Sequence, residues 1–398
     1  MSKKKDTYNQ TAIRTSIGGQ ALIEGIMMRG PKLTAMAVRN TKGEIVIEKE
    51  PTTMSKHKKV GKIPFVRGIF NFVDSMRCGY KYLMRSAQLS GLEEAEAELA
   101  REKEEKKRKK AGEAAAEEIS GNPVDPAGTV TATSVAQPTE EAGAAPSADN
   151  AMPAPDGDGA AAVIPEPKKE NSPLSVLVMV LGVVFGVGIA VGLFVILPTL
   201  IYKGFAHLIP GLQPAGHVAL TSLYKSLIEG IARILLLVGY MAAVSLMKDI
   251  RRTFQYHGAE HKTIFCYEHG LPLTVENVRK QRRFHPRCGT SFLILMALVG
   301  IFISFLIDPL YYLISGSDAG MPLVLRWGIK LLLIPLIVGI GYELIKFAGR
   351  HDNLLTRIIS APGLWLQRLT VYEPDDSMNE CAIAAVKEVI PDDGSDRL

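Results

Sequence analysis

The chain has 398 residues, of which 47% are apolar and 22% are charged, so it is too long for one ordinary domain and too apolar for a simple soluble protein. Forty-six Lys and Arg against 41 Asp and Glu give a net charge of +5, which is too small to indicate a nucleic-acid-binding protein. The four cysteines lie far apart without a repeated spacing. This excludes a secreted disulfide framework and favours a reducing compartment.

The first 92 residues are predicted to form a small cytoplasmic region of mixed helix and strand. Residues 18–31, GGQALIEGIMMRGP, are punctuated by glycines, but they lack the Gly-Lys-Ser/Thr ending of a phosphate-binding loop. Within this segment, Glu24 and Arg29 are charged residues among apolar ones. We interpret them as a structural ion pair, and a functional polar role is the alternative.

The next two elements of this region are a hairpin and a helix. Apolar and polar residues alternate over residues 34–49 around a turn at residues 40–43, which predicts a β-hairpin. Over residues 65–89 apolar residues recur at helical spacing between basic ones, which predicts a basic amphipathic helix. Such a helix suits the anionic inner leaflet of a membrane, or it packs on the rest of the cytoplasmic region.

Residues 93–172 are predicted to be a linker. No aromatic residue occurs between Tyr82 and Phe185, and a charged run gives way to a stretch rich in Ala, Pro, Gly, Glu and Asp. Such a composition cannot bury a core, so we expect a charged helix that runs into a disordered tether. The tether would let the N-terminal region dock on other cytoplasmic parts.

Four long apolar segments then predict a mainly α multi-pass membrane protein. Each segment is long enough to cross a bilayer, which takes roughly 20 residues in a helix. The four segments are residues 174–202, 227–247, 292–314 and 323–347. We assign transmembrane helices 1 and 2 to residues 173–247 and helices 3 and 4 to residues 291–348.

The orientation in the membrane follows from the basic residues. The connection 248–290 carries nine Lys and Arg, whereas the connection near residues 315–321 carries none, so the positive-inside rule makes the first cytoplasmic and the second external. Four spans then place both termini in the cytoplasm of a cell-membrane protein. The nine basic residues are Lys248, Arg251, Arg252, Lys262, Arg279, Lys280, Arg282, Arg283 and Arg287.

Several residues within the spans need an explanation. Glu229 and Arg233 are one helical turn apart and are expected to neutralise each other. Other ionisable residues in the spans fit either snorkelling near helix ends or a transport path. In the first span, the pairs Gly182–Gly186 and Gly188–Gly192 would allow close contact with another helix and so an oligomer, although glycines are common in membrane helices.

The C-terminal region, residues 349–398, is predicted to be cytoplasmic and amphipathic. Two short helices are expected on either side of Pro362-Gly363, with Trp365 suited to a membrane interface. Asp375 or Asp376 is expected to cap a last helix.

Candidate metal-binding and catalytic residues are concentrated in the cytoplasmic connection between transmembrane helices 2 and 3. His257 and His261 lie at i and i+4, on one helical face, with Glu260 beside them, in the H-x-x-E-H order of inverted zinc-protease motifs. Further along, His285 and Cys288 offer two more ligands. Three protein ligands would leave a position for water on Zn or another divalent metal, with Glu260 as general base, whereas four would make a closed structural site.

The same connection carries arginines that suit an anion. Arg282, Arg283 and Arg287 are concentrated there, as a phosphate or carboxylate of a substrate or lipid headgroup would require. Alternatively, these arginines are only the positive-inside signal, and the histidines are hydrogen-bonded at the membrane surface.

Four separated motifs resemble the YqhQ-like family of bacterial membrane proteins. They are GGQALIEGIMMRGP at residues 18–31, YHGAEHK at 256–262, HPRCGTSF at 285–292 and PGLWLQ at 362–367, and they cover nearly the whole chain outside the linker. The resemblance implies a family of unknown function that is described at most as a predicted metal-dependent enzyme. It also implies that Gln20, Glu24 and Arg29 belong with the histidine clusters as substrate-binding or anion-binding residues.

Three functions are compatible with these patterns. The first is a metal-dependent hydrolase at the cytoplasmic membrane face, closed over by the Glu24/Arg29 segment. The second is a noncatalytic membrane scaffold or assembly factor, and the third, less favoured because no inverted repeat is evident, is a transporter. The expected partners are the lipid bilayer and either an anionic lipid or another membrane protein, and no nucleic acid is expected.

Overall fold

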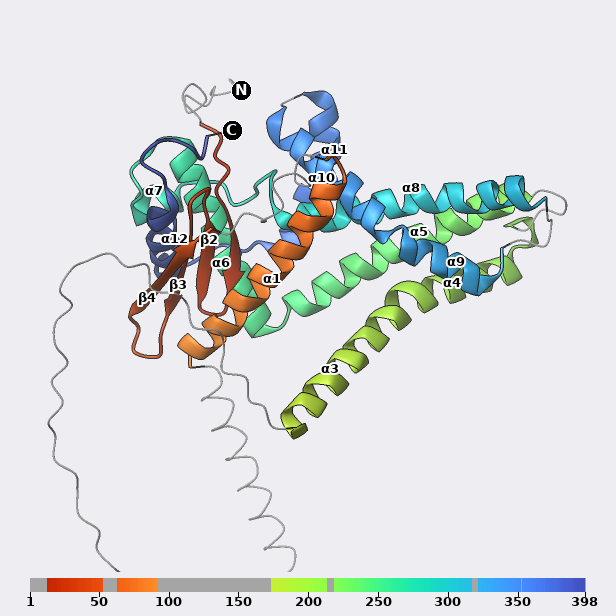
Figure 1. Ribbon diagram of the computed structural model, residues 1–398, viewed down its shortest axis with the longest axis horizontal. Helices are drawn as coiled ribbons and strands as arrows, with labels where there is room; N and C mark the ends of the chain where they lie inside the picture. Colours follow the sequence, from red (N-terminus) through yellow and green to blue (C-terminus); the bar gives the residue numbers. More distant parts are fainter. Residues whose placement is uncertain are drawn as a thin grey trace, which may run out of the picture. The chain divides into compact units, whose positions relative to one another are not determined.

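The computed structural model shows a mainly helical chain with a small N-terminal antiparallel sheet (Figure 1). The predicted linker at residues 93–172 lies outside the residues that the structure describes. The described residues are 13–52, 63–91, 173–212, 218–316, 321–351 and 353–397.

The sheet is an antiparallel meander of four strands in chain order. They are β1 (Gly18–Leu22), β2 (Gly25–Arg29), β3 (Leu33–Arg39) and β4 (Ile45–Pro51). The pairing of β3 with β4 confirms the predicted hairpin. The first two strands were not predicted, because helices cover both faces of β2 and bury four of its five residues, which removes the alternation that marks a half-exposed strand.

A helix covers one face of the sheet. Helix α1 (Val66–Leu89) confirms the predicted amphipathic helix, and its Tyr82 joins Met27 and Met36 of the sheet in one buried cluster. Its basic side chains face the last strand, where Lys81 and Arg85 form ion pairs with Glu50 and Glu48. The alternative that α1 packs on the rest of the N-terminal region is therefore confirmed for this part of the helix.

Two more helices cover the other face. They are α6 (Lys248–Glu268) and α12 (Asp376–Val389), and they share a second buried cluster with Ile26 and Met28 of β2. Asp375 caps α12 by accepting a hydrogen bond from the backbone N–H of Met378, as the sequence predicts. The short helix α7 (Val275–Arg279) packs against α6 and α12.

The apolar segments form long helices. Helix α3 (Pro173–Val191) continues through a π-helical turn, η3 (Gly192–Ile196), into α4 (Leu197–Leu208), and a 3-10 turn, η4 (Pro210–Leu212), follows. Helix α5 (Val218–Ser245) packs along α8 (Gly289–Ser315). Helices α9 (Leu323–Leu332) and α10 (Ile334–Arg350) meet at a 40° bend.

By length and composition, three of these helices could cross a membrane, or four if the bent pair α9–α10 is one span. These helices are compatible with membrane association. The predicted ion pair within α5 is present, because Arg233 donates a hydrogen bond to the buried Glu229 carboxylate over 3.1 Å. Lys330 of α9 also approaches that carboxylate, at 3.6 Å.

The prediction of two short helices around Pro362-Gly363 is wrong, because α11 (Leu354–Thr370) is one helix. Its first turn is held by a capping box in which Asn353 and Thr356 exchange hydrogen bonds. A side chain at Gly363 would collide with Ser291, so the missing Cβ lets α11 lie directly on the start of α8. This packing supports a helix through a proline that would otherwise interrupt it.

One glycine sets how closely α6 approaches the chain after α11. A Cβ at Gly258 would collide with the carbonyl oxygen of Tyr372. Because a backbone atom cannot move aside cheaply, Gly258→Ala is expected to destabilise the protein by about 1–3 kcal/mol. Thermal unfolding of the purified protein measures the change. The matched control is Gly239→Ala in α5, where the added methyl meets no atom within 4 Å, and an equal loss of stability in both variants would contradict the explanation.

Candidate metal centre

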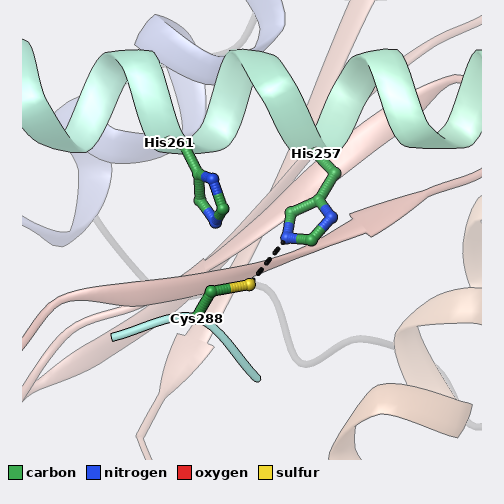
Figure 2. Close-up of side chains that lie close together, drawn as sticks. All are labelled: His257, His261 and Cys288. Atoms are coloured by element: carbon green, nitrogen blue, oxygen red, sulfur yellow. Dashed lines mark hydrogen bonds between the residues drawn. The ribbon is translucent and has the colours of Figure 1, made fainter. Parts of the chain in front are cut away.

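Three potential metal ligands converge where α6 meets the start of α8. His257 and His261 project from the same face of α6, one turn apart, and Cys288 lies directly before the first residue of α8 (Figure 2). One ligand atom from each residue lies within 4.8 Å of the other two. Among the described residues, this is the group of His, Cys, Asp and Glu side chains that could hold a metal ion.

Each imidazole is oriented by a backbone carbonyl group. His257 Nδ1 lies 3.0 Å from the carbonyl oxygen of Thr370, and His261 Nδ1 lies 2.5 Å from that of Arg283. Since a carbonyl only accepts hydrogen bonds, both Nδ1 atoms carry a proton, and in a neutral ring this leaves the lone pair on Nε2. Metal-binding histidines are commonly held in this way by their second nitrogen.

The two Nε2 atoms face the sulfur of Cys288. His257 Nε2 lies 3.1 Å from Cys288 Sγ, and His261 Nε2 is buried without a hydrogen-bond partner among the described residues. Burial by itself raises the pKa of the Cys288 thiol, but the nearby His261 and hydrogen bonds from Thr290 outweigh it, so that its pKa lies below the ordinary value. An orphaned imidazole nitrogen and an acidified thiol fit a zinc ion, which prefers nitrogen and sulfur ligands.

His285 is not part of this cluster. Its Nδ1 accepts a hydrogen bond from the Arg287 backbone, and its Nε2 faces the Glu268 carboxylate at 3.6 Å. Gln367 of α11, which is fully buried, accepts from the His285 N–H over 2.9 Å and donates to its carbonyl oxygen over 2.7 Å. The three-ligand group therefore contains Cys288, whereas the His285 ring lies 5.6 Å from that of His261 and its Nε2 faces Glu268. The backbone of His285 takes part in the packing of α11 onto the chain before α8.

Glu260, the predicted general base, is buried between α6 and β1. One side of its carboxyl group meets the backbone of Gly19, where an added Cβ would lie 3.0 Å from Glu260 Cδ. Its Oε2 atom has no hydrogen-bond partner among the described residues. Burial raises the pKa of Glu260 to about 7. Glu260 is adjacent to His261 in the chain but lies outside the group of three ligands.

The three arginines predicted to hold an anion have different partners. Arg287 forms an ion pair with the buried Glu268, and Arg283 approaches Glu373 at 3.6 Å. Arg282 lies over the ring of Phe265. These contacts fix the connection between α6 and α8, and an anion-binding role for the three residues stays a prediction.

The N-terminal segment lies against α6, although not through the expected contacts. The predicted pair between Glu24 and Arg29 is absent, because Glu24 binds Arg252 of α6 and Arg29 binds Asp74 of α1 at 2.8 Å. The two side chains separate because Glu24 lies in the turn between β1 and β2, in the left-handed backbone region with φ 51°, whereas Arg29 ends β2. Gln20 packs on Gly79 of α1.

Some residues that build the site could not be recognised from the sequence. The carbonyl groups of Thr370 and Arg283 leave no signature, since every residue has a carbonyl. Glu268 and Gln367 act through contacts between segments that lie far apart in the chain. The motif PGLWLQ contains Gln367 and was the one available signal for its importance.

The chain thus combines apolar helices with a helix-covered sheet that carries a His/His/Cys cluster. It matches the family described as "Protein of unknown function (DUF1385)" over residues 63–392. It is also 32% identical to "Uncharacterized protein YqhQ" of Bacillus subtilis (strain 168) over 378 residues, which cover 94% of this chain and 92% of that protein. The chain therefore belongs to the YqhQ-like family, as its motifs predicted. No solved structure matches it significantly.

The buried Glu268 network predicts a pH-dependent stability. Burial alone would raise the pKa of Glu268, but the His285 ring 3.6 Å away, the charge of Arg287 and a hydrogen bond from the Thr15 backbone hold it below its ordinary value of 4.5. A carboxylate with a depressed pKa stabilises the folded state above its unfolded pKa, and this stability is lost as the pH falls through the folded value. Glu268→Gln is therefore expected to cost about 2 kcal/mol at neutral pH.

The difference in unfolding free energy between wild type and Glu268→Gln should shrink when the pH falls below about 4.5. Denaturant titrations across this range measure it. The exposed Glu276, which pairs only with Lys280 four residues away, provides the control variant Glu276→Gln, and its effect should stay small. A difference for Glu268→Gln that is constant with pH would contradict this account.

Proposed function

We propose that this protein is an integral membrane protein that carries a catalytic zinc site at the cytoplasmic membrane face and acts as a metal-dependent hydrolase. The apolar helices support four spans when the bent pair α9–α10 counts as one. The basic connection between α5 and α8 contains the site and, by the positive-inside rule, faces the cytoplasm together with both termini.

The observation that carries the proposal is a ligand set of three. His257 and His261 are oriented by hydrogen bonds to backbone carbonyl groups, and their Nε2 atoms converge with Cys288 Sγ. Structural zinc sites have four protein ligands, whereas catalytic sites keep one position for water. Three ligands among the described residues therefore favour catalysis over a closed structural site.

When bound, zinc would supply a Lewis acid and a water molecule of lowered pKa. The chain itself would supply the group that accepts the proton. Glu260 is suited to this task, because it lies on α6 directly before His261 and retains one carboxylate oxygen that no described residue engages. The Gly19 backbone holds the other side of the carboxyl group and fixes its orientation.

A second function, a noncatalytic assembly factor, is favoured by one observation. The donors come from α6 and the start of α8, and the end of α11 orients His257, while both His261 and Cys288 are buried. A metal there would also join the helix-covered sheet to the apolar helices. The two functions differ in whether a fourth coordination position accepts an exchangeable ligand.

Metal analysis of the detergent-purified full-length protein is the first test. About one zinc ion per chain is expected, and His257→Ala with His261→Ala should abolish binding. His351→Ala removes an exposed histidine at the end of α10 and is the matched control, which should keep the metal. A protein that folds normally, yet binds no divalent metal when zinc is supplied, would rule the site out.

Cobalt substitution then separates the two functions. Co²⁺ at the site should show a sulfur-to-metal charge-transfer band that disappears in Cys288→Ser. Added azide should shift the cobalt spectrum if one position is open, and should leave it unchanged if the site is closed. Glu260→Gln should retain the cobalt but alter the pH dependence of its spectrum, because the residue acts on the bound water and not as a ligand. A spectrum insensitive to azide would favour the assembly function.

A further inference from the structure

The first half of α1 and the residue before it present several exposed apolar side chains. Phe65 and Phe70 are exposed, and Val73 and Met76 retain 59% and 58% of their surface. Phe70, Val73 and Met76 recur at helical spacing and form one stripe, and Phe65 lies directly before the helix. The opposite face of the helix is the one that packs on the sheet, through Tyr82 further along. Exposed apolar side chains that gather on one helix face in this way mark an interaction surface.

The same half of α1 is anchored to the apolar helices. Gly68 lies against Tyr342 of α10, where an added Cβ would be 2.8 Å from the Tyr342 Cβ. Arg67 forms an ion pair with Glu343, the next residue of α10. The ring of Phe72 lies 5.9 Å from that of Phe292, which belongs to the first turn of α8. The first half of α1 therefore lies beside the first turn of α8, which directly follows the basic connection.

Helix α11 offers a second stripe at the same end of the apolar helices. It begins four residues after α10 ends, and Leu354, Ile358 and Trp365 are 74%, 60% and 53% exposed. Its other face is fixed on the start of α8 through Gly363 and through Gln367, which binds Ser291. The stripe thus continues directly from a proposed membrane span, with a tryptophan of the kind that is enriched at membrane interfaces.

Basic side chains accompany both stripes. Arg77 on α1 and Arg357 and Arg368 on α11 are exposed. An apolar stripe with basic neighbours is the pattern of a helix that lies in the headgroup region of an anionic leaflet. Both stripes lie near the C-terminal end of α10. A bilayer surface around that end requires this shared location, whereas a protein partner would not require it.

We propose that the first half of α1 and the outer face of α11 form an interfacial belt, which lies in the cytoplasmic leaflet and contacts anionic lipids. The belt consists of Phe65 directly before α1, Phe70, Val73 and Met76 of α1, and Leu354, Ile358 and Trp365 of α11. This inference rests on the membrane orientation of the proposed function and adds that an element of the N-terminal region is itself inserted into the lipid. The metal cluster, which the end of α11 orients through Thr370, then lies next to the lipid headgroups.

Tryptophan fluorescence tests the belt, because the chain has only two tryptophans, Trp327 and Trp365. The full-length protein is reconstituted into vesicles of phosphatidylcholine and phosphatidylglycerol, with or without bromine on the acyl chains near the glycerol. In Trp327→Phe the remaining Trp365 should lose most of its emission in brominated vesicles. Val73→Trp in a chain with both native tryptophans changed to Phe should lose emission to the same degree.

Two further single-tryptophan proteins distinguish the possible failures. Lys42→Trp, in the exposed turn between β3 and β4, should keep its emission, since that turn lies in the sheet. Trp365→Phe leaves Trp327 in α9, and quenching of Trp327 reports the spanning helices themselves. If Trp327 is quenched but Trp365 and the tryptophan at position 73 are not, the belt is wrong while the membrane protein stands. If Trp327 is also unquenched, the proposed function falls as well.

Discussion

The candidate site depends on two hydrogen bonds from imidazole rings to backbone carbonyl groups. His257 and His261 share one face of α6 through helical geometry alone, but the direction of each ring is set by Thr370 and Arg283, which lie in other segments. Both segments must be docked before the two Nε2 atoms face Cys288. The cluster is therefore a property of the tertiary fold, and any change that separates α11 from α6 would disorganise it without touching a ligand.

Two glycines make this docking possible. At Gly258 the chain after α11 passes so close to α6 that a methyl group does not fit, and at Gly363 the helix α11 meets Ser291 in the same way. The first approach joins α6, which covers the sheet, to the chain after α11, and the second joins α11 to α8. The buried Gln367 also links α11 to the chain before Cys288 through the His285 backbone. The candidate metal cluster lies where these helices meet. The same close packing therefore holds the three ligands together and holds the helix-covered sheet against the apolar helices.

Local patterns predicted much of this architecture, and long-range contacts account for what they missed. The hairpin of β3 and β4, helix α1, the ion pair of Glu229 with Arg233 and the cap at Asp375 all depend on residues close in sequence. The strands β1 and β2 and the unbroken helix α11 depend on packing from distant segments. The choice of Cys288 over His285 belongs to the same class, since both lie more than twenty residues beyond His261 and only the fold distinguishes them.

The burial of Glu260 connects two motifs that the sequence presents separately. An ionisable carboxyl group away from water is costly unless it is paired, and the described residues give Glu260 a backbone contact at Gly19 but no cation. At Gly19 a Cβ would lie 2.7 Å from the Met27 carbonyl oxygen and 3.0 Å from Glu260 Cδ, so that a side chain there would displace the carboxyl group. The glycine-rich start of β1 is thus shaped to admit Glu260 beside the histidine cluster. Buried carboxyl groups with a raised pKa occur at functional sites more often than elsewhere, which supports the role that we propose for Glu260.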